Sequence, residues 1–445
     1  MSEPANDTPE LRRLSKKCNK IPLEPGEHVL IVSSPAPEAQ FSTALLCRAI
    51  LETGGVFHVT FSEPVMELEM ISQILESQPN CVPVLIGVDL DQKTTAKPPH
   101  ERLIVVGSSS GKSSKVHALG DSTSLSAATY VLAKEKLAAG RAELQLAVQA
   151  ALVGSRQQPK DPAVNELLQI GAASGISKGL KSFLVFGMNF LPAPQALQYS
   201  IRPYLEGFSG NPGQCERLID EAGIPLFRRT SPLDQLTVDD KQKLMQNLVP
   251  KLAQKTITGV TGQDYEFPSE KTESPMRFLS QMSALSESAW SRRMLGLSIG
   301  VWIGDRARML RQLIDSQISH AQSVISGLQA VSGEMGMASP SGSESVTVLR
   351  MPSLQKEILG DVAEILIEGG KSAGRFLMLC SIDHIGISWK GDAYDLKRVI
   401  RVLQEQELSP VSASRSSVRI GSKREETPRV AQSVLEEMAV AKHES

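Results

Sequence analysis

The segment that most resembles a reactive site is GSSSGKSS at 107–114, which directly follows a predicted strand. A glycine-rich loop ending in Gly-Lys-Ser can wrap a nucleotide phosphate with its backbone amides. Such a loop needs one residue more than Gly107 and Gly111 enclose. The next residues, SKVHAL, predict a strand rather than the helix whose amino terminus would hold the phosphate. We therefore interpret the segment as a Ser/Gly loop.

Metal and proton-transfer chemistry has few candidates. The seven histidines are dispersed, with no HxH or HxxxH pair, and the five cysteines include no CxxC pair, which indicates reduced thiols and no zinc site. Asp89 and Asp91 end a predicted strand, where carboxylates can bind a metal ion, but a strand-terminating turn is the interpretation we favour. Asp383 and His384 lie between two predicted strands and indicate a turn.

Composition excludes several classes of function. A net charge of -2 over 445 residues gives no global basic field for nucleic acid, and an aromatic content of 4% argues against a surface built on base stacking. Basic residues gather between 371 and 424, where a nucleic-acid groove and a solvated face are both open interpretations. The absence of any run of 18 apolar residues and the polar amino terminus predict a soluble, cytoplasmic protein without membrane contact.

Four apolar strands are predicted in the first part of the chain. They cover 29–32, 57–61, 82–88 and 103–106, with helical patterns at 41–53 and 65–76. This alternation is typical of βαβ units and a parallel sheet. The loop at 33–39 follows the first strand, where an open α/β sheet usually places its chemistry. Its two prolines predict that it continues neither element, and its one ionisable residue is Glu38.

The remaining elements are less regular. Asp161-Pro162 predicts a helix start, and helical patterns cover 234–256 and 276–331. After a Ser/Gly-rich linker at 333–345, strands are predicted at 346–349, 375–382, 385–389 and 417–420. Two helices in this part are well specified: one at 393–405 capped by Asp392, and a last one from Thr427 that buries Val430, Val434, Leu435 and Met438.

Several phrases occur in an order that resembles a known family. They are VLIVSSPAPEAQFS at 29–42, VHALGDSTSLSAATYVLAKEKL at 116–137, LVFGMNFLPAPQALQYSIRPYLEGFSGNPG at 184–213 and DYEFPSEKTESPMRFLSQMSALSESAWSR at 264–292. The chain resembles the DHH phosphoesterase superfamily, specifically the archaeal RecJ-like branch. That branch includes GINS-associated nucleases and is similar to the DHH-type subunit of the CMG replicative helicase.

The resemblance implies a site whose ligands are lost. Family members bind two manganese or magnesium ions with aspartates and histidines from four motifs. At the aligned positions this chain has Ser34, Ala36, Glu38 and Ala39 in the first motif, Gly87 in the second, Gly107, Ser108 and Ser109 in the DHH motif, and Gln158 in the fourth. Only Glu38 keeps a carboxylate. The resemblance therefore implies a pseudo-enzyme with no catalytic residue, metal or cofactor.

An alternative remains open. A shifted register would admit Asp89, Asp91 and Asp121, and would make the chain a metal-dependent, single-strand-specific exonuclease or phosphodiesterase with an atypical site. The phrase EGGKSAGRF at 368–376 resembles the DHHA1 glycine motif, which contacts nucleic acid in active members. This implies Gly369, Gly370, Lys371 and Arg375 as nucleic-acid-binding candidates.

Together these features predict an α/β protein: a DHH domain with a parallel sheet, an inserted mixed α/β-helical region and a C-terminal DHHA1-like α/β domain. The expected boundaries are a polar arm at 1–20, the DHH-like domain at 21–160, a connecting helix at 161–182, the inserted region at 183–337, a linker at 338–345 and the DHHA1-like domain at 346–445. The implied function is a scaffold that binds GINS, and MCM through it, in an archaeal CMG-type helicase at the nucleoid. The motifs leave open whether the chain also contacts single-stranded DNA.

Overall fold

The computed structural model describes the chain in segments. These are residues 9–66, 68–90, 100–107, 116–121, 124–154, 161–335, 341–342, 345–370, 372, 374–390, 394–408, 410–413, 416–422 and 426–441. The chain forms two compact units. The first comprises Met1–Lys178, Glu266–Ser269 and Met294–Leu313, and the second comprises Gly179–Tyr265, Glu270–Arg293 and Ile314–Ser445.

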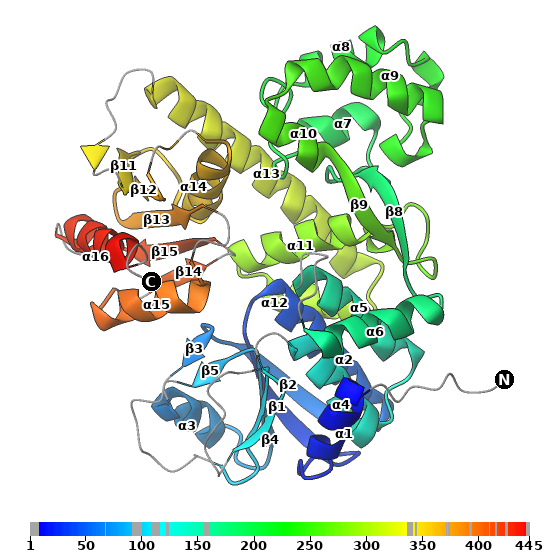
Figure 1. Ribbon diagram of the computed structural model, residues 1–445, viewed down its shortest axis with the longest axis vertical. Coiled ribbons are helices and arrows are strands. Elements are labelled where there is room, and N and C mark those ends of the chain that lie inside the picture. The colour runs from blue at the N-terminus through cyan, green and yellow to red at the C-terminus, as the bar shows by residue number, and fades with distance from the viewer. Residues whose placement is uncertain are drawn as a thin grey trace. The chain divides into compact units, whose positions relative to one another are not determined.

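The first unit is built on a parallel sheet, as the sequence predicts (Figure 1). Its strands are β1 (His28–Ser33), β2 (Val56–Phe61), β4 (Val82–Ile86), β6 (Ile104–Val106) and β7 (His117–Leu119), in the spatial order β2-β1-β4-β6-β7. Strands β3 (Val65–Met66) and β5 (Asp89–Leu90) form a separate parallel pair. The central strands are buried throughout because helices cover both faces of the sheet, which explains their continuous apolar runs.

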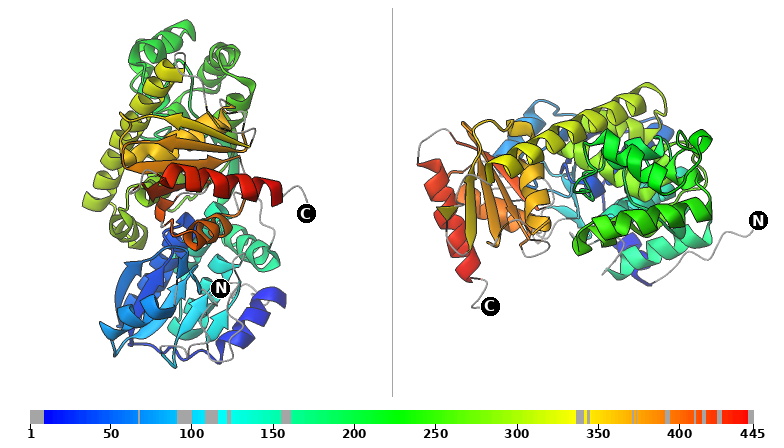
Figure 2. Two further views of the ribbon diagram at one scale, coloured as in Figure 1. Left: turned by 90° about the vertical axis from the view of Figure 1, so that its left-hand side faces the viewer. Right: turned by 90° about the horizontal axis from the view of Figure 1, so that it is seen from above.

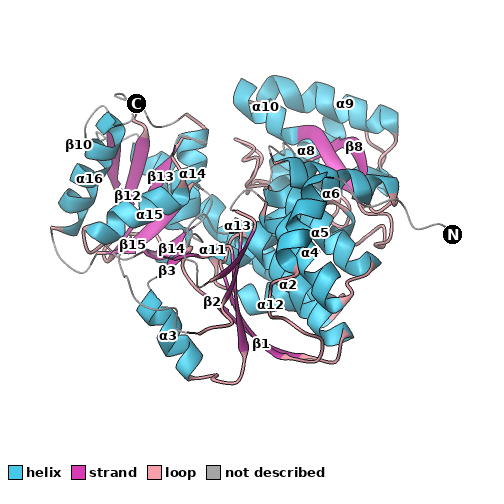
Figure 3. Cartoon of the chain, turned by 60° about the horizontal axis from the view of Figure 1, so that its bottom comes forward, coloured by secondary structure: helices cyan, strands magenta, loops and turns pink. Residues whose placement is uncertain are grey.

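The helices of this unit lie on two sides of the sheet (Figure 3). They are α1 (Pro9–Cys18), α2 (Pro37–Glu52), α3 (Leu68–Glu76), α4 (Leu125–Leu137), α5 (Arg141–Gly154), α6 (Pro162–Ala173) and α12 (Leu295–Ile303). On one face, Ile71 and Leu75 of α3 pack against the even-numbered side chains of β1 and their neighbours. On the other side, α2 packs against α4, α5 and α12. Helix α2 is therefore the central helix of this layer.

Helix α12 is joined to α2 by specific contacts, although about 250 residues separate them in the sequence. Gln40 Oε1 accepts hydrogen bonds from Ser298 Oγ at 2.9 Å and from Trp302 Nε1 at 3.5 Å. The rings of Phe41 and Trp302 stack with centroids 4.4 Å apart. The helical pattern predicted over 276–331 is consequently not one helix. It divides into α11 (Leu279–Ser291), α12 and α13 (Arg308–Met335), and α12 belongs to the first unit.

Two other expectations for the first unit differ from the structure. Helix α2 begins at Pro37, inside the loop predicted at 33–39, because proline at the first helical position loses no hydrogen bond. The described part of the polar arm forms α1, whose Leu11, Leu14 and Cys18 are buried, since its few apolar residues fall on one helical face.

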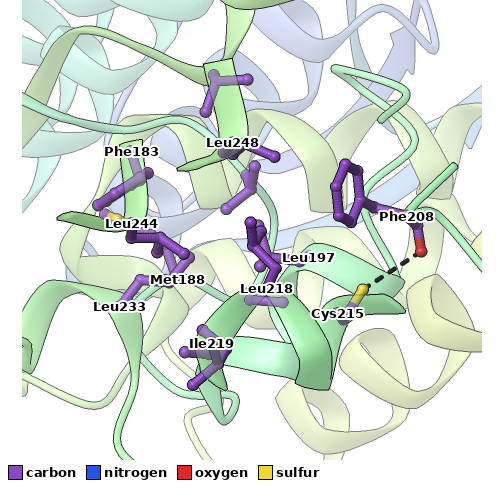
Figure 4. Packing of buried hydrophobic residues seen from close by; sticks show 14 of the residues in the cluster. Phe183, Met188, Leu197, Phe208, Cys215, Leu218, Ile219, Leu233, Leu244 and Leu248 are labelled. Atoms are coloured by element: carbon purple, nitrogen blue, oxygen red, sulfur yellow. Dashed lines mark hydrogen bonds between the residues drawn. The ribbon is translucent and has the colours of Figure 1, made fainter. Parts of the chain in front are cut away.

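The second unit begins with a small helical body that has its own core (Figure 4). Its elements are β8 (Lys178–Phe183), α7 (Ala193–Gln198), α8 (Pro212–Glu221), η1 (Leu226–Arg228), η2 (Leu233–Gln235), α9 (Val238–Leu248), η3 (Val249–Lys251), α10 (Gln254–Val260) and β9 (Thr261–Glu266), followed by η4 (Pro275–Arg277) and α11. Strands β8 and β9 form a two-stranded sheet. Leu197, Leu218, Ile219 and Leu244 from three helices meet in the core. The Cys215 thiol donates to the Phe208 carbonyl at 3.3 Å.

The C-terminal part of the second unit is a mixed sheet of six strands with helices on both faces (Figure 2). The strands are β10 (Ser341–Gly342), β11 (Val346–Arg350), β12 (Phe376–Cys380), β13 (His384–Trp389), β14 (Pro410–Ala413) and β15 (Ser417–Gly421), in the order β10-β11-β12-β13-β15-β14. The helices are η5 (Lys356–Ile358), α14 (Leu359–Glu368), α15 (Leu396–Glu405) and α16 (Thr427–Ala441). Helix α14 lies so close to β13 that a Cβ at Gly386 would stand 2.8 Å from the Leu359 backbone.

Most predicted elements of this part are confirmed, with two local corrections. The cap of α15 is Asp395, which accepts from the Arg398 N–H at 3.3 Å, because the helix begins later than predicted; Asp392 lies outside the described residues. In α16, Val434, Leu435 and Met438 are buried as predicted, but Val430 is 38% exposed.

In the first unit, the predicted cap of α6 by Asp161, followed by Pro162, is confirmed. Within the described segments, no helix has the length and hydropathy needed to cross a bilayer.

Candidate functional site

The carboxyl ends of β1, β4 and β6 bring the aligned motif positions together. The residue that follows each strand donates its backbone N–H to the neighbouring strand: Ser34 to Ile86 at 2.9 Å, Gly87 to Val106 at 3.0 Å and Gly107 to Leu119 at 3.1 Å. A Cβ on Gly87 would lie 3.5 Å from the Cβ atoms of both Ser34 and Ala39. Positions from separate motifs are thus in contact, at the edge where parallel sheets place their chemistry.

Both glycines at this edge have backbone conformations that disfavour other residues. Gly87 has φ +66° and Gly107 has φ +71°, in the left-handed region where a Cβ is strained. Aspartate tolerates this region better than most residues, but still at a cost. Glycine therefore suits the local turn at both positions, whatever chemistry the location supports.

The space in front of both glycines is filled by Leu125, the first residue of α4. A Cβ on Gly107 would lie 2.9 Å from Leu125 Cβ, and a Cβ on Gly87 would lie 3.2 Å from Leu125 Cδ2. Leu125 is 5% exposed. A carboxylate at Gly87 or Gly107 would have to displace this side chain, and would then face hydrocarbon.

Glu38, in the first turn of α2, directs its carboxylate to two other helices. Its Oε1 accepts the backbone N–H of Ser126 at 3.1 Å, in the first turn of α4. A Cβ on Gly154, at the end of α5, would lie 2.9 Å from Glu38 Cγ and still closer to the carboxylate. An acidic group beside the first turn of a helix is favoured by the unpaired N–H groups there and by the helix dipole. Glu38 thus serves as a cap supplied to α4 by another helix.

The serines and alanine of the first motif make local contacts. Ser34 is 2% exposed, and its Oγ accepts the Ala36 N–H at 3.4 Å. Ser33 Oγ donates to the Ser34 carbonyl at 2.9 Å and accepts from Thr43 Oγ1 at 2.7 Å. These hydroxyls are neutral, and hold the loop to the start of α2.

Asp89 and Asp121, the two described carboxylates of the shifted register, make separate local contacts. Asp89 is buried in β5 and pairs in register with Val65 of β3. Asp121 takes part in a turn with Ser124, whose Oγ lies 3.3 Å from its Oδ1. Asp91, Ser108, Ser109 and Gln158 lie outside the described residues. No group of three or more His, Cys, Asp and Glu side chains within the described segments is arranged to hold a metal ion.

The glycine motif of the second unit lies after α14. Gly369 ends that helix, and Gly370 has φ +76°, with Lys255 Nζ 3.3 Å from where its Cβ would be. Arg375 donates from Nη1 to the Ala439 carbonyl at 3.0 Å, near the end of α16. Lys371 is outside the described residues. Of the four nucleic-acid-binding candidates, Arg375 thus has part of its guanidinium engaged by the fold.

An ionic cluster in the second unit, whose Asp361, Glu364 and His320 are buried, joins α11, α13 and α14. Arg202 Nη2 lies 3.0 Å from Asp361 Oδ1 and 2.6 Å from Glu364 Oε2, and Nη1 lies 4.0 Å from Glu287 Oε2. His320 Nε2 lies 3.3 Å from Asp361 Oδ2. Burial would raise the pKa of Asp361, but His320 and Arg202 hold it well below its ordinary value. The pKa of Glu287 is raised to about 7, chiefly by burial.

The sequence does not single out the residues that shape the strand-end site of the first unit and the ionic cluster of the second unit. Gly154 is the glycine of the fourth motif and Leu125 lies in the phrase at 116–137, but no pattern predicts what either residue contacts. No spacing singles out Arg202 or His320. The local signal for Leu125 is its position at the start of a predicted helix, after a Ser/Thr-rich segment, which is common to many helices.

Comparison with solved structures identifies the architecture. CDC45 from Entamoeba histolytica matches with a TM-score of 0.61 over 95% of this chain and 96% of that protein, at 9% sequence identity. RecJ from Thermus thermophilus, in complex with Mn²⁺, matches with a TM-score of 0.50 over 97% of this chain and 55% of that protein, at 11% identity. The chain has a RecJ-like fold. No protein-family model and no curated protein matches it by sequence.

This RecJ-like fold, which is also similar to that of CDC45, confirms the fold that the motifs predict. The residues described at its strand ends do not fit a manganese site. Divalent manganese and magnesium ions take oxygen ligands, chiefly carboxylates, converging within about 2 Å. The described residues here offer two glycines, a leucine, neutral hydroxyls and a carboxylate engaged with α4.

Proposed function

We propose that this chain is a RecJ-like replication scaffold that does not cleave nucleic acid. In this proposal it binds GINS, and MCM through GINS, within a CMG-type helicase at the nucleoid. Its similarity in fold to CDC45 over nearly the whole of both chains supports the proposal, since the scaffold is kept from end to end.

The observation that carries the proposal is the position of Leu125 between Gly87 and Gly107. A two-metal phosphodiesterase requires anionic ligands at the strand ends, to generate a hydroxide and to stabilise the attacking and leaving oxygens. A buried leucine there excludes water and offers no ligand. The cap that Glu38 supplies to α4 supports the same conclusion, because it gives the retained carboxylate a structural role.

Two experiments test the two halves of the proposal separately. The first incubates the purified chain with labelled single-stranded DNA or RNA and manganese; the expected result is no cleavage above that of a mock preparation. Manganese-dependent degradation that is abolished by Glu38→Ala or Asp89→Ala would instead establish the exonuclease alternative.

The second experiment is affinity purification of the tagged chain from its native cells, followed by mass spectrometry. GINS and MCM subunits in stoichiometric amounts are expected. Their absence would overturn the replisome role even if the chain is inactive as a nuclease. A parallel titration with single-stranded oligonucleotide at low salt determines whether the scaffold also contacts DNA.

A further inference from the structure

Strand β2 is an open edge of the parallel sheet in the first unit. It has six residues, VFHVTF, and among the described residues no strand pairs with its outer side. The opposite edge, β7, has three residues. Exposed edges in soluble proteins are usually blunted by charged residues, proline or short length. Strand β2 has none of these features.

The hydrogen-bonding groups of β2 alternate between its two sides. The Val56 N–H donates to the Glu27 carbonyl at 3.2 Å, and the Ser62 N–H donates to the Ser33 carbonyl at 3.0 Å. These two bonds bracket the parallel register of β2 on β1, so the even-numbered residues direct their N–H and C=O groups to β1. The N–H and C=O groups of Phe57, Val59 and Phe61 consequently face outward.

The three residues whose backbone groups face outward form the sequence Phe-Val-Phe, which is the same from either end of the strand. Phe, Val and Phe at 57, 59 and 61 would pair with themselves in an antiparallel register centred on Val59. Each Phe57 would lie opposite a Phe61, and the two Val59 residues would lie opposite each other. Aromatic and β-branched cross-strand pairs stabilise sheets. All six residues would keep their faces, because the period of the side chains is two.

We propose that β2 pairs with β2 of a second copy of this chain across a two-fold axis, which makes the two sheets one continuous sheet. The backbone groups admit only an extended strand as occupant, and the symmetry of the Phe-Val-Phe sequence favours the same strand from a second copy. Two exposed apolar side chains flank this edge, Val56 at 56% and Leu51 at 50% exposed, and would add contact area. One added strand pair is a small interface, so we expect reversible association with a dissociation constant on the order of 10 μM.

His58 provides a charge-swap test. The His58 side chain is exposed and lies on the opposite face of the sheet from the side chains of Phe57, Val59 and Phe61. In the proposed register it is diagonal to His58 of the second copy. His58→Lys and His58→Glu each place like charges across the two-fold axis. Each is expected to raise the dissociation constant of the dimer about five- to tenfold in sedimentation velocity, and an equimolar mixture of the two variants is expected to restore association.

Ile382→Lys and Ile382→Glu are the matched controls, because Ile382 is 81% exposed and belongs to the other unit; both are expected to associate like the wild type. Hydrogen exchange adds a second readout. The amides of Phe57, Val59 and Phe61 are expected to gain protection as concentration rises, while those of Val56 and His58 are protected at every concentration.

Three results would overturn the proposal. One is a wild-type chain that is monomeric at concentrations about tenfold above the expected constant. Another is a dimer that is insensitive to both His58 variants, which would place the interface elsewhere. The third is protection of the three outward-facing amides only when a different protein such as GINS is added, which would assign the edge to a heterologous strand.

Discussion

Glu38 Oε1 lies 3.1 Å from the backbone nitrogen of Ser126, so the carboxylate retained at the aligned motif positions caps a helix. A carboxylate among packed side chains requires a partner for its charge. Here the unpaired N–H groups at the start of α4 provide that partner. This contact makes the structural role of Glu38 in the pseudo-enzyme proposal testable by denaturation as well as by activity.

Glu38→Ala is expected to lower the free energy of unfolding by about 1–2 kcal/mol, because α4 loses a charged acceptor at its first turn. Glu38→Gln keeps a side-chain oxygen and should lose less. Urea denaturation followed by circular dichroism measures both. Equal stability of the Ala variant and the wild type would contradict the capping role.

Gly107→Asp, which places a carboxylate at the position aligned with the DHH motif, is expected to destabilise the chain by about 2–4 kcal/mol and to confer no manganese-dependent cleavage. The reasons are the left-handed φ of Gly107 and the overlap of a Cβ with Leu125. Leu125→Ala alone should cost about 2–5 kcal/mol as a cavity.

Combining Gly107→Asp with Leu125→Ala tests whether the two positions share the same space. The double variant should lose less stability than the sum of the single variants, by at least about 0.5 kcal/mol in a double-mutant cycle. Strict additivity would show that Leu125 does not fill the space in front of Gly107.

Arg202→Met is expected to cost about 3–5 kcal/mol, because Asp361 and Glu364 remain buried and lose the guanidinium that they share. Arg229→Met is the control: Arg229 pairs with Asp220 at the surface, where both side chains are about a third to a half exposed, and should cost at most about 1 kcal/mol. Similar losses for the two variants would contradict the importance of burial in the Arg202 cluster.

Asp264 is expected to make the second unit more stable in mild acid than at neutral pH. It is fully buried, accepts from the Ser280 and Tyr265 N–H groups and from Ser280 Oγ, and burial raises its pKa from the ordinary value of 3.8 to about 6. Because the folded state binds the proton more tightly, this contribution to stability is complete below the unfolded pKa and is lost as the pH rises from about 4 through 6.

Asp264→Asn should flatten this part of the pH dependence, measured as the free energy of unfolding at a series of pH values. Asp264→Leu should also flatten it but should destabilise the chain at every pH, because two backbone N–H groups lose their acceptor. If the free energy of unfolding changes between pH 4 and 6 with the same slope in the wild type and in Asp264→Asn, the raised pKa of Asp264 is contradicted.

The elements that could be predicted from local sequence are those with a regular apolar pattern or a capping residue. The apolar runs of β1, β4 and β6 and the Asp161-Pro162 start of α6 are readable because burial on both faces and capping depend on neighbouring residues only. The same reasoning placed the start of α2 too late, since Pro37 was interpreted as a break rather than as a first helical residue. It also treated residues 276–331 as one helical stretch.

The RecJ-like order of elements and the residue types without carboxylate or imidazole at Ser34, Ala36, Gly87 and Gly107 could be predicted from the sequence, because both are properties of residues in their own segments. Only the tertiary structure decided that Leu125 fills the space between two of those positions, that Glu38 caps α4, and that Arg202 meets Asp361. Each of these contacts joins segments that are far apart in the sequence, and side chains at such separation have no common period or spacing. Packing of elements against one another, which no local pattern encodes, fixes which side chains meet.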